Sequence, residues 1–284
     1  MINLEDGQDM YLTDFLYDGV KLSSLGYLVG SAVTSNNESA SAGSKLDLQT
    51  VMNYGNHINE IINVQYNECI SVTFDIIKYA CTDTIDTIVE DKEVSYFMRW
   101  LNRTTNHKFF PIYNDALFHN IYFNGTFTDI STIQKGGNIV GFTVTFIANT
   151  PYGYVDFGEQ EFIIASNNDS FTYYDESDEY GMHYPEQVII QLTNGGDLTL
   201  RNLLNNKATI INNCHSGEKI TFDCVHKIIK SNQSDIHTTL HKDFNYVFPS
   251  ICNTEESREN IITSNLSCII KLIYKPIRKV GIVV

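Results

Sequence analysis

The chain has 284 residues, of which 43% are hydrophobic, 12% aromatic and 19% charged. This is the composition of a globular protein with a sizeable core, and it excludes a mostly disordered chain. The formal net charge of −15 disfavours nucleic acids and anionic membrane surfaces as partners, because like charges repel.

The first residues, MINLEDGQDM, have neither the basic start nor the apolar run of a secretion signal. No stretch reaches the roughly 20 apolar residues that a membrane helix needs. The six cysteines form no CxxC pair, and a chain made in the cytosol would keep them as thiols. We therefore expect a protein that is made in the cytoplasm and has no membrane segment.

The first 81 residues predict strands interrupted by one polar loop. Asp18-Gly19 is a favoured two-residue hairpin turn. Residues 31–45, which are small and polar, predict a loop. Residues 46–81 predict strands, because apolar side chains alternate with polar ones. The alternation is clearest at Ile70, Val72, Phe74 and Ile76.

The clearest helix in the sequence is predicted over 93–102. Its apolar residues recur at the spacing of one helix face, at Val94, Phe97, Met98 and Leu101. The only tryptophan, Trp100, lies at the margin of that face, next to Arg99. Trp and Arg are common at the energetic centres of interfaces, so the pair is a candidate subunit interface. The alternative is a structural corner, with Trp100 packed beneath the sheet and Arg99 solvated.

Strands resume after the helix, over 108–113 and 120–127. A further alternating strand runs through Phe142, Val144, Phe146 and Ala148. Pro and Gly in 150–154, TPYGY, end this strand, and we place a domain boundary near residue 156.

The second half predicts many short strands, which is typical of a sandwich or barrel. Asn194-Gly195-Gly196-Asp197 predicts one hairpin turn, and Ser216-Gly217 predicts another. The fold class is therefore all-β with one short helix in the first domain. The two domains are expected over 1–156 and 157–284.

Two groups of residues have the composition of a metal site, but their spacing argues against one. His237 and His241 lie in a segment that we expect to be extended, which would place them about 13 Å apart. The second group is Cys214, His215, Cys224 and His226. If Ser216 to Lys219 is a four-residue loop, Cys214 pairs with Thr221, and Cys224 faces the other side of the ladder. A register change of one residue would alter that result. We expect neither a metal nor a cofactor.

The segment 171–187 mixes tyrosines with acidic residues. Exposed aromatic side chains beside carboxylates could bind a glycan or a protein partner, and the alternative is a solvated acidic edge loop. The candidate residues are Tyr173, Tyr174, Tyr180 and Tyr184. The sequence contains no GxGxxG, Walker, GxSxG or HExxH motif, so we predict no enzyme and no catalytic residues. A hydrolase with an unrecognised carboxylate pair is a third alternative.

The order of these segments resembles the distal tail protein (Dit-like) family of long-tailed, siphovirus-type phages. In the first half the resemblance is carried by Arg99-Trp100-Leu101, Lys108-Phe109-Phe110, Gly136-Gly137 and Thr150 to Tyr154. In the second half it is carried by GGDLTLRN, GEKITFD, HKDFNYVFP and YKPIRKVG. It implies a first domain of split-barrel or sandwich type, akin to tail-tube subunits, and a second, galectin-like β-sandwich. Lys108 and Phe110 join Arg99 and Trp100 as candidate interface or corner residues.

The resemblance further implies a structural virion protein at the tail tip, assembled in the host cytoplasm. Six copies would form a ring between the tail tube protein and the tail-associated hub or lysin protein, with receptor-binding proteins at the periphery. DNA would pass through the ring without sequence-specific binding, and acidic groups facing the channel would repel its phosphates. The alternative function is a carbohydrate-binding β-sandwich protein that uses the tyrosine-rich segment 171–187.

Overall fold

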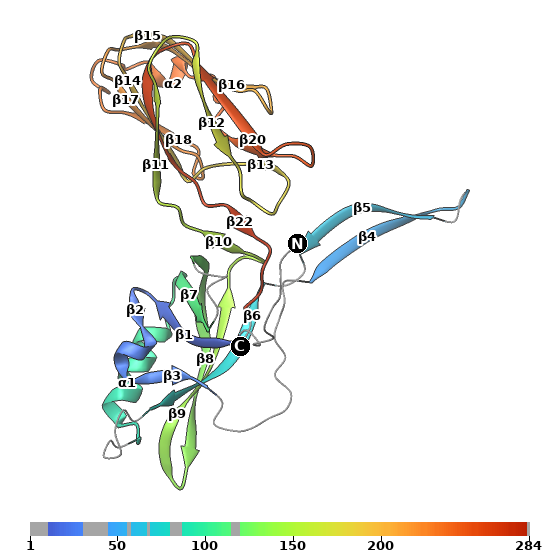
Figure 1. The fold of residues 1–284 in the computed structure, drawn as a ribbon, viewed down its shortest axis with the longest axis vertical. Coiled ribbons are helices and arrows are strands. Elements are labelled where there is room, and N and C mark those ends of the chain that lie inside the picture. The colour runs from blue at the N-terminus through green and yellow to red at the C-terminus, as the bar shows by residue number, and fades with distance from the viewer. Residues whose placement is uncertain are drawn as a thin grey trace. The chain divides into compact units, whose positions relative to one another are not determined.

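The computed structural model describes residues 11–30, 45–55, 58–66, 69–79, 87–114 and 120–282 (Figure 1). The expected all-β fold is confirmed, and most elements are antiparallel strands. The chain forms two compact units. The first comprises the residues up to Tyr154 together with the segment that starts at Lys279, and the second comprises Val155–Arg278. The boundaries fall within β10 (Gly153–Val155) and directly after β22 (Ile277–Arg278). The expected loop over 31–45 lies outside the described residues, apart from Lys45.

The first unit is built on one antiparallel sheet in the order β2-β1-β7-β8-β9-β6-β3. These strands are β1 (Leu12–Tyr17), β2 (Val20–Lys21), β3 (Tyr27–Val29), β6 (Ser71–Lys78), β7 (His107–Tyr113), β8 (Ile121–Lys135) and β9 (Asn138–Ala148). Asp18 and Gly19 join β1 to β2 with φ of 50° and 76°, which is the two-residue turn that the sequence predicts. A short 3₁₀ helix, η1 (Leu22–Leu25), follows β2.

Helix α1 (Asp91–Leu101) begins two residues before the predicted start. Glu90 and Glu93 form a capping box, in which each side chain accepts a hydrogen bond from the other residue's backbone N–H. Phe97 and Leu101 are buried as predicted, but Met98 is 39% exposed. Trp100 and not Met98 completes the buried face, so this face is rotated around the helix toward Trp100 compared with the apolar spacing.

The core of the first unit is mostly aromatic. Alternate residues of β6 and β9 face it, which confirms the predicted alternation at Ile70 to Ile76 and at Phe142 to Ala148. Its fully buried large side chains are Phe15, Tyr17, Tyr27, Phe97, Phe109, Tyr122, Phe123, Phe127, Phe142 and Phe146. Phe97 of α1 stacks on Phe142 of β9, with the ring centroids 4.6 Å apart. The helix therefore closes one face of the sheet through stacked rings.

A separate two-stranded ribbon is formed by β4 (Leu46–Asn53) and β5 (Ile58–Tyr66), which pair with each other (Figure 1). Every residue of β4 and of β5 as far as Gln65 is exposed. The period-two pattern predicts these strands correctly. The described part of the chain does not bury the apolar face that this pattern creates.

The second unit is a β-sandwich. One sheet has the order β11-β21-β14-β17-β18 and the other has the order β12-β20-β15-β16. The strands are β11 (Glu159–Ile164), β12 (Asp169–Tyr174), β14 (Gln187–Leu192), β15 (Gly196–Asn202), β16 (Lys207–Cys214), β17 (Lys219–Asp223), β18 (Ile228–Ser231), β20 (Glu259–Ser264) and β21 (Cys268–Ile273). A small third pair joins β13 (Gly181–His183) to β19 (Ile251–Asn253).

Both predicted hairpins of the second half are wrong. The Asn194–Asp197 turn joins β14 to β15 and the Ser216-Gly217 turn joins β16 to β17, but in each case the two strands belong to different sheets. The Asn194–Asp197 turn, which takes the chain from one sheet to the other, needs glycines for a different reason than a hairpin does. A Cβ on Gly195 would lie 2.9 Å from the Cys214 carbonyl oxygen, and Gly196 has a φ of 138°. The true hairpins of this region are β15–β16 and β17–β18.

The strand pairing that we assumed for Cys214 in the sequence analysis is therefore also wrong. Cys214 pairs with Gly196, not with Thr221, and both Cys214 and Cys224 are buried in the sandwich core. The segment around His237 is also not extended. It forms turns and the one-turn helix α2 (Leu240–Asp243), because Thr239 and Asp243 make a local side-chain hydrogen bond that favours a turn.

Candidate functional site

The β4–β5 ribbon has one apolar face and one polar face. Leu48 pairs with Val64, and Thr50 pairs with Ile61. Register partners lie on the same face, and alternate residues of β4 share that face. Its large apolar side chains are Leu46, Leu48, Met52, Ile61 and Val64, which are 50%, 49%, 47%, 57% and 50% exposed. The unpaired residue of the β5 bulge, Ile62, is 63% exposed.

The opposite face of the ribbon is polar and carries no positive charge. Gln49 pairs with Asn63, Asp47 pairs with Gln65, and Glu60 pairs with Val51. The sequence from Leu46 to Tyr66 contains no Lys or Arg. The ribbon therefore presents mainly aliphatic side chains on one face, and carboxylates and amides together with Val51 and Ile58 on the other.

Covering the apolar face would favour association. Fully burying a Val, Leu, Ile or Met side chain contributes about 1.5–3 kcal/mol. Covering the exposed half of the five paired-face side chains would contribute on the order of 4–7 kcal/mol per copy, before the costs of association. Two-stranded ribbons are marginally stable alone in water, so a partner would also stabilise the ribbon itself.

Trp100 is buried in the first unit, where the end of α1 meets β1. It is 3% exposed and stacks on Phe15 of β1, with the ring centroids 5.8 Å apart. Its indole Nε1–H donates a hydrogen bond to the Tyr17 carbonyl oxygen at 3.0 Å. The Arg103 guanidinium ties the end of the helix to the β1–β2 turn through an ion pair of 2.9 Å with Asp18. His107 Nδ1 lies 3.0 Å from the other oxygen of Asp18, a contact that the sequence spacing gives no reason to expect.

The four candidate corner or interface residues do not form one site. Arg99 is exposed, and its Nε–H donates to the Ser95 carbonyl oxygen within the helix. Lys108 and Phe110 are half-buried on the face of β7 opposite Phe109, where both contact Tyr122. The Lys108 ammonium lies 4.7 Å from the centre of that ring, so the pair is a cation–π contact within the first unit.

The four candidate tyrosines of the second unit are also dispersed. Tyr173 is 6% exposed and packs edge-on against Tyr274 in the sandwich core, so it is not available to a surface ligand. Its neighbour Tyr174 faces outward, as alternation along β12 requires. Tyr174, Tyr180 and Tyr184 are exposed, and Tyr184 lines a groove.

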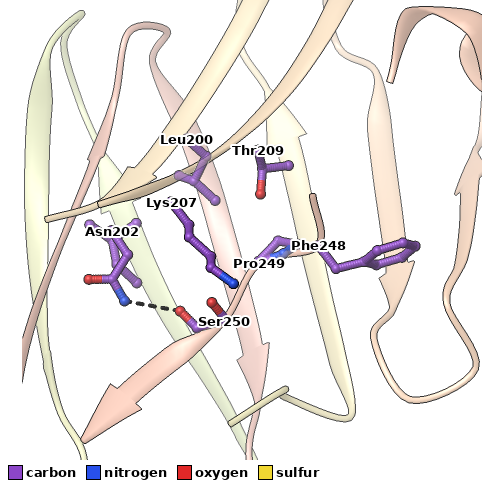
Figure 2. Close-up of a pocket in the computed structure, with 8 residues that line it drawn as sticks. Leu200, Asn202, Lys207, Thr209, Phe248, Pro249 and Ser250 are labelled. Carbon is purple, nitrogen blue, oxygen red and sulfur yellow. Dashed lines mark hydrogen bonds between the residues drawn. The ribbon is translucent and has the colours of Figure 1, made fainter. Parts of the chain in front are cut away.

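That groove measures about 530 Å³ and is lined by Tyr184, Lys207, Ala208, Lys227, Tyr246, Val247 and Phe248. The Lys227 ammonium lies over the Tyr184 ring, 2.9 Å from its centre. A second cavity next to Lys207 measures only about 20 Å³, which is the space of one water molecule (Figure 2). In it the Asn202 amide donates to the Ser250 carbonyl oxygen at 3.0 Å. The groove is thus large enough to hold a small ligand.

A buried polar cluster surrounds His237 in the second unit. His237 Nδ1 lies 2.8 Å from Glu218 Oε1, and Nε2 lies 3.3 Å from Asp243 Oδ2. Burial raises the pKa of Glu218, but hydrogen bonds from Ser231, the His215 N–H and His237 outweigh it, so the pKa lies below its usual value. Hydrogen bonds from Thr239 and Asn213 likewise lower the pKa of Asp243, with His237 adding to the effect.

Within the described ranges, no group of three or more His, Cys, Asp or Glu side chains is placed to hold a metal ion. Among those same residues, none of the helices is long and apolar enough to cross a membrane. The described cysteines Cys69, Cys214, Cys224, Cys252 and Cys268 are free thiols. Burial raises the pKa of Cys214 to about 12, which makes it an inert core residue.

An antiparallel sheet with one helix, a β-sandwich and an exposed apolar ribbon together define a two-domain β protein of the kind that assembles with other chains. The chain belongs to a family of phage tail proteins. The model described as phage tail protein N-terminal domain matches residues 10–150, and the model described as phage tail C-terminal domain matches residues 152–274.

Solved structures agree with this family at the level of the fold. The Dit protein of phage SPP1, described as a paradigm of the hub adsorption apparatus in phages that infect Gram-positive bacteria, is similar with a TM-score of 0.64. It is 12% identical, and the likeness covers 93% of this chain and 99% of that one. A chain of the phage P2 baseplate in its activated conformation with Ca is 13% identical, with a TM-score of 0.45 over 95% of this chain and 98% of that one. No curated protein matches the chain. The expected phage tail family is therefore confirmed, and the chain shares its fold with the SPP1 Dit protein.

Proposed function

We propose that this protein is the distal tail subunit of a long-tailed phage, and that six copies form a ring between the tail tube and the tail-tip hub. Membership of a phage tail family and the fold shared with SPP1 Dit support the place in the tail. The observation that carries ring formation is the exposed apolar face of the β4–β5 ribbon. The role is structural and needs no catalytic residue.

The occupant of the apolar face is a second copy of the same chain. A ring needs head-to-tail contacts that close, in which one surface of each copy meets a different surface of the next. The ribbon suits such a contact, because among the described strands β4 and β5 pair only with each other, and because the ribbon has one apolar face. Burying this face on a neighbour would also remove an exposed apolar patch that a free subunit keeps in water.

The polar face of the ribbon suits the channel through which DNA passes. It carries Asp47 and Glu60 among amide side chains, without a positive charge. Six copies would line the channel with carboxylates, which repel phosphates and let DNA slide without binding. The tail tube protein would bind one side of the ring and the tail-associated hub the other, with receptor-binding proteins attached at the periphery. Assembly in the host cytoplasm agrees with free cysteine thiols.

A pair of double variants tests ring formation through the ribbon. L48E/V64K places one charge of each sign on the apolar face, and Q49E/N63K places the same pair on the polar face one position along. Both changes leave the net charge unaltered and add an attractive cross-strand pair. We expect L48E/V64K to remain monomeric in sedimentation velocity, while Q49E/N63K assembles like the wild type. Equal assembly by both variants would refute the role of the apolar face.

A further inference from the structure

The groove at Tyr184 and Tyr246 is distinct from the surfaces used in the proposed ring, and it lies wholly within the second unit. Its volume of about 530 Å³ is within the range of small-ligand sites. Its walls come from the start of β16, the β17–β18 turn and the segment 246–248. Two lysines and two tyrosines thus converge from positions far apart in the sequence.

The groove is positively charged in a protein with a formal net charge of −15. Among the residues that the structure describes, neither Lys207 nor Lys227 forms an ion pair with a carboxylate. The contact of Lys207 is to the Met182 sulfur at 3.0 Å, and that of Lys227 is to aromatic rings. Burial, together with the positive charge of Lys207, holds the pKa of Lys227 below its usual value. An anion between the two ammonium groups would relieve this repulsion.

The backbone at the groove is held in an unfavourable conformation. Lys227 and Tyr246 have φ of 57° and 58°. The other described non-glycine residues with positive φ are all Asn or Asp, which tolerate this region, at Asp18, Asn120, Asn168, Asn206 and Asn213. Lysine and tyrosine lack the short polar side chain that lets Asn and Asp tolerate this region. Strain of this kind concentrates at ligand sites, where it positions a side chain.

The Tyr246 side chain is fixed and exposed. Its hydroxyl donates to the His241 carbonyl oxygen at 2.6 Å, and its ring packs on Phe244 at 5.3 Å between centroids. The side chain is nevertheless 66% exposed. A rigid ring with a free surface can pack against the C–H face of a sugar ring.

A peptide is a poorer fit, because the nearby sheet edge is already used. Strand β16 is at the edge of its sheet, but Asn245 covers it. The Asn245 N–H donates to the Ile210 carbonyl oxygen, and its side-chain amide donates to the Ala208 carbonyl oxygen and accepts from the Ile210 N–H. An incoming strand would find these backbone groups occupied.

We propose that this groove binds an anionic glycan, a saccharide that carries phosphate or carboxylate groups. Tyr246 supplies the stacking surface, Lys207 and Lys227 bind the anion, and Tyr184 positions the Lys227 ammonium through the cation–π contact. Binding weakens with added salt, because the lysines are exposed to solvent.

Isothermal titration calorimetry on the full-length protein tests this site with four probes. These are tetragalacturonic acid for carboxylates, a glucosylated glycerol-phosphate oligomer for phosphates, neutral maltotetraose, and hexaglutamate as an anion without sugar. We expect at least one anionic glycan to bind, and maltotetraose and hexaglutamate to bind at least roughly tenfold more weakly. Which of the two glycans binds identifies the anion. The proposal fails if neither anionic glycan binds, or if hexaglutamate binds as tightly as the glycan.

Matched variants locate the binding. K207Q/K227N removes both groove lysines, and Y246N removes the stacking ring while supplying a residue that tolerates positive φ. Each should weaken glycan binding by roughly tenfold or more, without lowering the thermal midpoint of the protein. The control K219Q/K230Q removes two exposed lysines from β17 and β18 outside the groove, and should change the affinity by less than about twofold. Equal weakening by the control would show that only net charge matters and would overturn the site.

Discussion

Replacing Trp100 tests directly whether its side chain stabilises the first unit. The side chain is 3% exposed, stacks on Phe15, packs edge-on against Phe97, and donates its indole N–H to the Tyr17 carbonyl oxygen. Truncating a buried aromatic side chain to alanine costs about 3–5 kcal/mol. Trp100→Phe keeps much of the stacking but leaves the Tyr17 carbonyl without this donor, which costs about 1–2 kcal/mol. We expect W100A to lower the free energy of unfolding of the first unit by about 3–5 kcal/mol and W100F by about 1–2 kcal/mol.

Hydrogen exchange read by mass spectrometry is the suitable assay, because W100A removes the only tryptophan and the two units are read separately. Peptides from β7 and β8 should lose protection, while peptides from β14 and β17 should not. The control is Arg99→Ala, whose exposed side chain hydrogen-bonds to Ser95 of its own helix, and it should cost less than about 0.5 kcal/mol. An effect of W100A below about 1 kcal/mol, with ring assembly lost, would refute the corner and place Trp100 in a subunit interface.

Two further predictions concern the sheet of the first unit and the polar cluster of the second. A Cβ on Gly141 would lie 2.2 Å from the Ile76 carbonyl oxygen, so Gly141→Ala should cost about 1–3 kcal/mol in urea unfolding followed by Trp100 fluorescence. Gly30→Ala, where the nearest atom is 3.8 Å away, is the control, and equal costs would contradict the crowding argument. The pKa of Glu218 is depressed in the folded protein, so its stabilising contribution is present above the unfolded value of about 4.3 and is lost as pH falls through the folded pKa. The midpoint temperature of thermal unfolding of the second unit should therefore fall as the pH drops below about 4.5. Glu218→Gln should make this fall with pH shallower. An unchanged fall would show that other carboxylates cause it.

Local patterns in the sequence predict most of the elements. Alternation locates β6 and β9, and the helical spacing locates α1 to within two residues. These predictions succeed because the period of apolar residues follows directly from the geometry of a helix or strand. Alternation would also have separated Tyr173 from Tyr174, since neighbours on a strand face opposite sides, and only one of them can be at the surface.

The failures share a physical cause. The turns at Asn194–Asp197 and Ser216-Gly217 have hairpin residues, but both sheets of a sandwich present the same alternating pattern to one core. The residues of a turn therefore do not predict whether the next strand joins the same sheet or the other sheet. The groove combines Tyr184, Lys207, Lys227 and Tyr246, and the contact of His237 with Glu218 joins residues 19 positions apart. No local period links such residues, because only the sheet topology brings them together.

The ribbon shows a different limit of sequence reasoning. Its alternation predicts half-buried strands, and the pattern is correct, but the surface that would cover the apolar face is not supplied by the described part of this chain. A sequence records that a face is apolar without recording which molecule covers it. The second copy of the chain is the partner that the account requires.

The most direct test of the ring is the solution mass of the wild-type protein, measured together with negative-stain electron microscopy of the same sample. The account predicts an assembly of six times the 32.3 kDa of one chain, seen as a six-fold ring with an open centre. It also predicts that L48E/V64K abolishes this ring, whereas Q49E/N63K preserves it. A compact monomer of 32.3 kDa that persists at high protein concentration would contradict the central claim.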